Sequence, residues 1–400
     1  MNRRNFMKST ACLSLATAVS SMSASPLPID RSDIRITKIE SYTIRPKRWK
    51  MIGKNSHKDR HGQLGRDLFL RIHTNAGIEG IGYARVEQQQ AAQLIGQDPL
   101  SYMTPGEGII SPLDRGDAPL WDLAGKIYDV PTWKLFGGYG PEWLPVYDGS
   151  IYFADIMPEY VSQGIDRILY EVDYSLKMGH RAYKIKIGRG WKWMEKEAGL
   201  RRDIEVVKAI RKLVGPDVKL GVDANNGYDY ATTIRFLEGI DDELYFTEEM
   251  FPETVEEDLA LKAWLRKQGL KTLLADGESA KEESHFTPYI NARAMDVLQG
   301  DMRRFGFTRL LRLSRMSASA GIYLAPHNWG SYMGGYMQAI LGRGIPNLLM
   351  AELDPAQTDL FDVDDFELKE GKMRVPDIPG CGLVLKDREL AKLEADWVVE

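Results

Sequence analysis

The chain has 400 residues, of which 44% are hydrophobic and 27% are charged, a composition typical of a globular protein. This length predicts two domains, one of them large enough to be an α/β barrel. The chain has 52 Lys and Arg residues and 57 Asp and Glu residues, so its net charge is −5. The chain therefore lacks the excess of basic residues that is typical of proteins that bind nucleic acids or anionic membranes. No apolar run reaches the roughly 18–20 residues of a membrane span.

Residues 1–24 have the layout of an export signal. Arg3, Arg4 and Lys8 precede a mildly apolar stretch that is rich in Ala, Ser and Thr and ends in small residues. The paired arginines resemble a bacterial twin-arginine signal, which predicts a periplasmic protein. The alternative is an ordinary basic tail.

The two cysteines, Cys12 and Cys381, are too few for a zinc-finger site or a disulfide framework. Cleavage of the predicted signal would remove Cys12 and exclude a disulfide within the mature chain. Any bound metal must therefore be held by oxygen or imidazole ligands.

Residues 34–144 are predicted to form a small α+β domain. Residues 34–45 alternate and are rich in β-branched residues, which is typical of a strand. Two further strand-like runs, 67–74 and 80–86, are separated by Asn75-Ala76-Gly77, so a hairpin is expected. Within residues 114–136, an apolar face predicts a helix that ends before Pro131; it consists of Leu120, Leu123, Ala124 and Ile127.

The segment 47–66 is strongly polar and punctuated by glycines, which favours a flexible or functional loop. His57 and His61 are four residues apart and could suggest a metal-binding pair. The glycines and charges around them argue against a helix, so we expect solvated loop residues near the substrate.

From residue 145 the pattern changes to eight short apolar runs separated by amphipathic helical stretches. Alternating strands and helices over residues 145–375 predict a parallel (β/α)₈ TIM barrel, and residues 376–400 are expected to pack back toward the N-terminal domain. The runs begin at Pro145, Arg181, Val218, Leu244, Lys271, Met295, Gly321 and Asn347.

Ionisable residues end most of these runs. From Lys186 onward, with Glu278 for the fifth run, one such residue per run is separated from the next by 23 to 37 residues, about one βα unit. Because the carboxyl ends of barrel strands meet at one mouth, these side chains should converge there. They are Lys184, Lys186, Asp223, Glu248, Asp276, Glu278, Asp301, His327 and Glu352.

The acids of three consecutive strands predict a metal site. A single acid such as Asp223 after a strand is usually a helix N-cap or a turn former. Three of them brought together repel one another and need a cation, and carboxylate oxygens favour Mg²⁺. The third ligand is Asp276 or Glu278, whereas Asp223 and Glu248 supply the first two.

Two further pairs indicate acid–base chemistry. Lys184 and Lys186 lie on one face of a strand, where their mutual repulsion should favour a neutral amine that acts as a base. His327 alone would be an ordinary core histidine. Asp301, one strand earlier, can bond its imidazole, fix its tautomer and raise its basicity.

With these residues in place, almost the whole chain after residue 34 resembles the enolase superfamily, in particular the mandelate racemase subgroup of the mandelate racemase/muconate lactonizing enzyme-like family. The motifs that carry the resemblance are KIKIG, VDANNGY, FTEEM, GES, GDMRRFGFT, APHNWGS and MAELD. The chain departs from the family at Met250, where proline is usual. Because Glu249 is adjacent to Glu248, the alignment decides which of the two glutamates corresponds to the family's metal ligand.

The resemblance implies a role for each residue. The three Mg²⁺ ligands would be Asp223, Glu248 and Glu278, of which Glu278 matches the subgroup better than Asp276. Lys186 would be a base on one face of the substrate, and His327 with Asp301 behind it would act on the opposite face.

Lys184 would lie near the substrate carboxylate and tune Lys186. Glu352 would bond the carboxylate oxygen that becomes negative, and Asn225 would touch the substrate. The basic residues of 47–66 would suit an anionic, hydroxyl-rich substrate.

The implied reaction is Mg²⁺-dependent abstraction of the proton α to a carboxylate, which gives an enediolate. Dehydration of a sugar acid to a 2-keto-3-deoxy acid is the expected outcome, with racemisation, epimerisation or cycloisomerisation as alternatives. A more remote alternative is a non-catalytic periplasmic protein that binds sugar acids. The resemblance also implies a homo-oligomer, and the export signal is unusual for this family.

Overall fold

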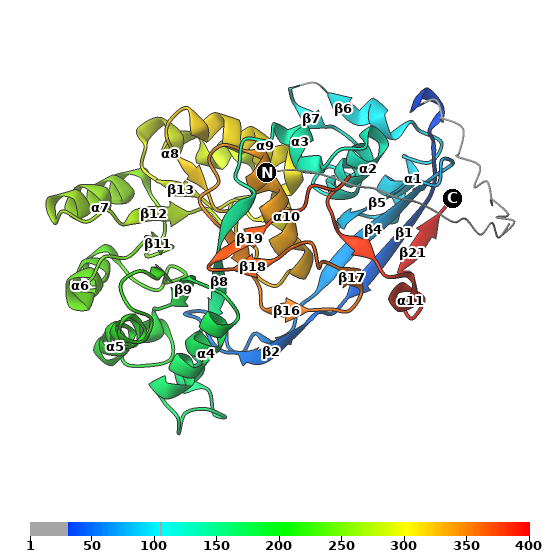
Figure 1. The fold of residues 1–400 in the computed structure, drawn as a ribbon. Helices are drawn as coiled ribbons and strands as arrows, with labels where there is room; N and C mark the ends of the chain where they lie inside the picture. The colour runs from blue at the N-terminus through cyan, green and yellow to red at the C-terminus, as the bar shows by residue number, and fades with distance from the viewer. Residues whose placement is uncertain (1–30, 105) are drawn as a thin grey trace, which may run out of the picture.

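Residues 31–104 and 106–400 are described by the computed structural model (Figure 1). The export signal predicted at 1–24 therefore lies outside the described residues. None of the helices in the described ranges is long and apolar enough to cross a membrane.

An antiparallel sheet of order β21-β1-β4-β5 forms the base of the N-terminal domain. The expected hairpin is confirmed, because β4 pairs with β5 from Phe69 opposite Tyr83 to His73 opposite Glu79. At the other edge, β21 from the end of the chain pairs with β1, so the last residues return to this domain. The strands are β1 (Ile36–Ile44), β4 (Asp67–Thr74), β5 (Glu79–Tyr83) and β21 (Trp397–Val399).

Helix α2 (Ala118–Tyr128) covers this sheet, as its apolar spacing predicts. Its four predicted face residues are all buried. The helix crosses β5 at two glycines, and a Cβ on Gly80 would lie 2.2 Å from the Pro119 carbonyl oxygen. The short helix α3 (Thr132–Phe136) follows Pro131, and α1 (Gln88–Ala92) precedes α2.

The segment 47–66 is more ordered than its polarity predicts. It contains β2 (Lys47–Ile52) and β3 (Gly62–Leu64), which pair with each other. The partner on the other side of β2 is β16 (Ala356–Gln357), about 300 residues along the chain. The expectation of a flexible loop is therefore wrong for both ends of this segment.

Eight parallel strands form the second domain, and the (β/α)₈ fold is confirmed. Seven strands lie within a predicted apolar run, and β8 begins two residues before its run. They run in the order β14-β13-β12-β11-β10-β9-β8, and β15 pairs with β8. A parallel bridge between Leu324 and Leu348 joins the two ends and closes the barrel. The strands are β8 (Trp143–Ile151), β9 (Ala182–Lys186), β10 (Lys219–Asp223), β11 (Phe246–Glu248), β12 (Leu273–Asp276), β13 (Val297–Leu298), β14 (Tyr323–Leu324) and β15 (Ala351–Leu353).

The helices between these strands are amphipathic and bury one face against the barrel. Several begin with a side-chain cap, such as Asp229 before α6 and Ser331 before α10. The helices are α4 (Ile165–Lys177), α5 (Lys196–Val214), α6 (Tyr230–Ile240), α7 (Val255–Lys267), α8 (Thr287–Ala292), α9 (Met302–Ala318) and α10 (Tyr332–Gly344).

Short elements after β15 lead the chain back to the N-terminal domain. Among them, β19 pairs with the start of β8, and β17 pairs with β20. They are β17 (Phe361–Asp362), β18 (Leu368–Lys369), β19 (Lys372–Arg374), β20 (Val384–Leu385) and α11 (Asp387–Leu390). The two-stranded pair β6 (Met103–Thr104) and β7 (Gly108–Ile109) belongs to the N-terminal domain.

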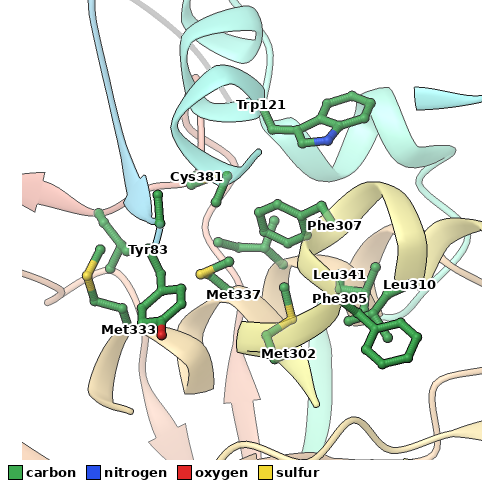
Figure 2. Packing of buried hydrophobic residues seen from close by; sticks show 14 of the residues in the cluster. Tyr83, Trp121, Met302, Phe305, Phe307, Leu310, Met333, Met337, Leu341 and Cys381 are labelled. Atoms are coloured by element: carbon green, nitrogen blue, oxygen red, sulfur yellow. The ribbon is translucent and has the colours of Figure 1, made fainter. Parts of the chain in front are cut away.

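One hydrophobic core is shared by the two domains (Figure 2). Trp121 of α2 packs in the same cluster as Phe307 of α9 and Met337 of α10. Cys381, from the returning C-terminal segment, is buried here with a free thiol. The N-terminal domain is thus fixed on the barrel by continuous packing.

Two buried carboxylates of the N-terminal domain add polar contacts to this interface. Asp67 accepts hydrogen bonds from the first two backbone amides of α10. Asp117 accepts from the amides of Phe307 and Thr308, directly after Gly306 breaks the helical path of α9 with φ +66°. Both carboxylates satisfy amides that a helix start leaves without partners.

Candidate active site

Strand register brings the predicted site residues side by side at the carboxyl ends of the barrel strands. Lys186 of β9 lies opposite Asp223 of β10, and Asp223 lies opposite Glu248 of β11. All three side chains are buried. Adjacent parallel strands therefore place a cation and two carboxylates next to one another.

Three carboxylates form a compact group that could hold a metal ion. Asp223, Glu248 and Glu278 each offer one oxygen, and these oxygens lie within 4.8 Å of one another. Asp276, the alternative third ligand, is outside this group, and its Oδ1 accepts a hydrogen bond from the Gly277 amide at 2.6 Å. The geometry therefore selects Glu278.

The adjacent Glu249 is also outside the group. Its carboxylate accepts a hydrogen bond from Asn225 Nδ2 at 2.9 Å, and its backbone has φ +43°. Of the two neighbouring glutamates, Glu248 is the one that faces Asp223 and Glu278.

The electrostatics of the group fit a divalent cation. Burial, together with the charges of Asp223 and Glu352, raises the pKa of Glu248 to about 8. Burial also opposes ionisation of Asp223, but Lys186 and Lys184 outweigh it and lower its pKa to about 2. Crowded anionic oxygens without thiolate or imidazole suit a hard ion, so the residues present fit Mg²⁺.

The two lysines contact these carboxylates directly. Lys184 Nζ lies 2.7 Å from Glu248 Oε1 and 2.9 Å from Glu352 Oε1. Lys186 Nζ is paired with Asp223 Oδ2.

The prediction of a neutral amine is wrong for this arrangement. Burial lowers the pKa of each lysine, but Glu248 and Glu352 raise that of Lys184 more, and Asp223 does the same for Lys186. Repulsion between the two amines therefore affects their pKa values less than attraction to the neighbouring carboxylates does. A metal ion held by Asp223 and Glu248 would compete with the two lysine amines for these carboxylate oxygens.

His327 and Asp301 form the expected pair across β13 and β14. Asp301 Oδ2 lies 2.7 Å from His327 Nδ1, and Glu278 Oε2 lies 3.1 Å from His327 Nε2. Burial lowers the pKa of His327, yet Glu278 and Asp301 outweigh it and raise the pKa to about 9. Nε2 of His327 thus faces the carboxylate group, whereas Asp301 holds Nδ1 on the opposite side of the ring.

Glu352 and Asn225 occupy different settings. Glu352 Oε2 accepts from the Asn328 amide at 2.7 Å, and its other oxygen faces Lys184. The side-chain amide of Asn225 is bonded on both sides, to Asn55 at 2.8 Å and to Glu249 at 2.9 Å. In this structure Asn225 joins the barrel to the segment 47–66.

Two basic residues of 47–66 have a different role from the one expected. Arg48 is buried in a two-bond ion pair with Asp354, and Lys50 is buried against Glu171. His57 is exposed, as expected, but His61 is half-buried, with its Nδ1 2.9 Å from the Gly53 carbonyl oxygen. Arg48 and Lys50 are therefore structural cations.

Sequence reasoning missed several residues of the site. Gln299, at the end of β13, donates a hydrogen bond of 2.6 Å to Glu248 Oε2. Tyr152 lies beside the site, with Lys186 Nζ 5.3 Å from its ring centre, and its ring is tilted against Trp329 at 4.8 Å. Uncharged strand ends carry little sequence signal, although Trp329 belongs to the APHNWGS motif that was noted.

Gly149 is a further residue that sequence reasoning missed. A Cβ at Gly149 would lie 2.2 Å from Glu352 Oε1. The first barrel strand therefore needs glycine at this position to leave room for the carboxylate.

Fold and site together define a class of protein: a (β/α)₈ barrel with an N-terminal α+β domain, three carboxylates that could hold a metal ion, and a lysine and a histidine in contact with them. Comparison with known families agrees. The chain belongs to the enolase superfamily, and its residues 168–389 match the family described as enolase C-terminal domain-like.

Relatives of known activity are similar over most of the chain. It is 31% identical over 282 residues to an arabinonate dehydratase of Saccharolobus solfataricus, which covers 68% of this chain and 69% of the relative. It is 25% identical over 367 residues to a D-xylonate dehydratase of Haloferax volcanii, covering 83% of this chain and 85% of the relative.

Solved structures show the same fold. A galacturonate dehydratase from a Geobacillus species, complexed with D-galacturonate and 5-keto-4-deoxy-D-galacturonate, superposes with a TM-score of 0.85 at 29% identity, over 92% of this chain and all of that one. An L-talarate dehydratase from Polaromonas, complexed with Mg and L-glucarate, gives 0.72 at 25% identity over 92% and 99% of the two chains.

Proposed function

We propose that this protein is a Mg²⁺-dependent sugar-acid dehydratase that starts its reaction by removing the proton α to a carboxylate. The observation that carries the proposal is that a lysine and a histidine contact different members of one carboxylate group. Lys186 contacts Asp223, and His327 Nε2 contacts Glu278. A substrate at this group would have a proton carrier available from each side.

Asp223, Glu248 and Glu278 would hold Mg²⁺, which when bound supplies positive charge that stabilises a developing carboxylate oxyanion. With Asp223 engaged by the metal, Lys186 would lose its ion-pair partner, could give up its own proton and would then take the α-proton. Lys184 and Glu352 would meet the substrate carboxylate, and the Lys184 ammonium, 2.9 Å from Glu352 Oε1, would balance the negative charge of the enediolate. Preorganised charge of this kind accounts for much of the barrier reduction in such reactions.

His327 would complete the dehydration. Protonation of a β-hydroxyl by its Nε2 lets water leave, so the enediolate becomes an enol that tautomerises to a 2-keto-3-deoxy acid. The Asp301 carboxylate at 2.7 Å holds Nδ1 and stabilises the protonated ring. Arabinonate, D-xylonate and galacturonate dehydratases among the relatives support this outcome.

A second outcome from the same intermediate is isomerisation. A D-galactarolactone cycloisomerase of Agrobacterium fabrum is 28% identical over 62% of this chain. If the side opposite Lys186 returns a proton to the α-carbon instead, the product is an epimer. The first half of the reaction is common to both outcomes.

We further propose export through the twin-arginine-like segment 1–24 and assembly as a homo-oligomer. Arg3 and Arg4 followed by a mildly apolar stretch support export. Fractionation of cells that express the full chain, with an Arg3→Lys, Arg4→Lys variant as control, tests it. Light scattering of the purified protein tests the oligomer.

The experiment for the function is a screen of purified protein with Mg²⁺ against mono- and diacid sugars, with 2-keto acids detected as semicarbazones. Dehydration predicts a signal for at least one acid that disappears in the His327→Asn variant. An epimer without keto acid would establish the second outcome. If neither product forms from any sugar acid, the proposal fails.

A further inference from the structure

A basic cleft lies between the two domains, behind the His327–Asp301 pair. It has a volume of about 580 Å³, and its wall is formed by the end of β5 and the segment after it, the loop after β12 and the first turn of α9. Five cationic side chains line it: Arg85, Arg115, Lys281, Arg303 and Arg304. Two acids, Glu87 and Asp301, line it as well.

Most of this positive charge is not neutralised by protein acids. Within the described ranges, Arg85, Lys281 and Arg304 form no ion pair, and Arg304 instead donates to the Glu278 carbonyl oxygen at 3.3 Å. Arg115 is paired with Glu282 at 2.8 Å, outside the wall of the cleft. A chain with net charge −5 therefore concentrates positive charge at one interdomain cleft.

Arg303, which lines the cleft, has a hydrogen-bond donor without a partner in the described residues. Its Nη2 lies 3.2 Å from Asp301 Oδ2, but its Nε is buried and has no hydrogen-bond partner in the described residues. A buried guanidinium donor normally finds an acceptor, and a planar guanidinium suits carboxylate or phosphate oxygens.

We propose that this cleft is a binding site for the phosphate or carboxylate group of a small anion. The volume is in the range of small-molecule sites, and walls of like charge around a cleft concentrate a counter-ion. The anion would contact both domains. Asp301 separates it from His327, so it would lie behind the acid–base pair.

The anion has two chemical sources. It is either a free oxyanion or the carboxylate of a second sugar-acid molecule, and the second source rests on the proposed function. Binding of inorganic phosphate, measured by titration calorimetry without any substrate, tests the site independently of catalysis.

The test variant is Arg85→Gln with Lys281→Gln, because both side chains are exposed and unpaired in the described residues, so their loss should leave the fold intact. The matched control is Arg201→Gln with Lys208→Gln, which removes the same charge from the exposed side of α5. Thermal melting verifies that both double variants fold. If the double variant of the cleft does not fold, each of its single variants is tested instead.

The proposal predicts that the dissociation constant for phosphate rises at least tenfold in the cleft variant and stays within twofold in the control. Calorimetry with a sugar acid in place of phosphate then separates the sources. Two acid molecules bound per wild-type chain and one per chain of the cleft variant identify a second sugar-acid molecule, and one in both proteins identifies a free oxyanion. Absence of phosphate binding to the wild type, or an equal effect of both double variants, overturns the proposal.

Discussion

Single side chains at the barrel mouth act in fixed pairs. Lys186 is held by Asp223, and His327 is held by Asp301 on one nitrogen and faces Glu278 with the other. Each carrier therefore has a defined orientation before any substrate is bound, which is the condition for efficient proton transfer.

Loss of either proton carrier should stop turnover without unfolding the protein. We expect Lys186→Met and His327→Asn each to lower kcat by about 10²–10⁴-fold, the range of general acid–base contributions. Steady-state kinetics with the acid found in the screen measures the effect. A variant that keeps more than a tenth of the wild-type kcat would remove that residue from the mechanism.

Gly149 is expected to matter through Glu352. An Ala Cβ would meet Glu352 Oε1 at 2.2 Å, and that carboxylate cannot move freely because the Asn328 amide and Lys184 hold it. We predict that Gly149→Ala lowers kcat at least tenfold with a small change in melting temperature. Gly300→Ala, whose Cβ would make only ordinary contacts from 3.4 Å, is the control; equal kcat values in the two variants would contradict the prediction.

At the scale of elements, the two domains are joined through helix starts. Asp67 and Asp117 from the N-terminal domain reach backbone amides of α10 and α9. Burial raises the pKa of each carboxyl to about 6, although the hydrogen bonds they accept lower it in part.

The raised pKa of Asp117 predicts a pH dependence of stability. Its ordinary value is 3.8, so between about pH 4 and 6 the folded state binds a proton that the unfolded state does not. The contribution of Asp117 to the free energy of unfolding is thus largest at low pH and is lost as the pH rises through 6. Relative to Asp117→Asn, the wild-type free energy of unfolding should increase by about 1 kcal/mol from pH 7 to pH 5. Urea unfolding at both pH values measures it, and a constant or decreasing difference would contradict the raised pKa.

The barrel elements are predictable from sequence because their signals are local. Most strands are short apolar runs followed by an ionisable residue, so the eight runs and the convergence of their acids follow from spacing. Spacing left the third ligand open between Asp276 and Glu278, and the family resemblance favoured Glu278. The segment 47–66 shows the limit, because β2 pairs with β16 and Arg48 pairs with Asp354, both about 300 residues away. Gln299 was missed because an uncharged amide at a strand end has no distinctive pattern.

At the scale of the whole molecule, the N-terminal domain reaches the barrel mouth through Asn55, which donates a hydrogen bond to Asn225. Three crowded carboxylates, one with its pKa raised to about 8, are more stable with a bound cation than without. We predict that chelation abolishes activity and that Mg²⁺ at about 100 times its Kd restores it while stabilising the fold by roughly 2.7 kcal/mol.

Thermal melting across a Mg²⁺ series, with Asp223→Asn as control, measures this stabilisation. A wild-type melting temperature that does not depend on Mg²⁺, together with full activity in chelator, would contradict the metal assignment.

The most direct test of the account is exchange of the α-proton. Candidate sugar acids are incubated in deuterated water with Mg²⁺ and with the wild type or the Lys186→Met, His327→Asn double variant, and deuterium at the α-carbon of acid and product is followed by NMR. The account predicts α-proton loss or exchange with the wild type for the acid that is turned over, and none with the double variant. Binding of sugar acids without exchange, or equal exchange in the double variant, would contradict it.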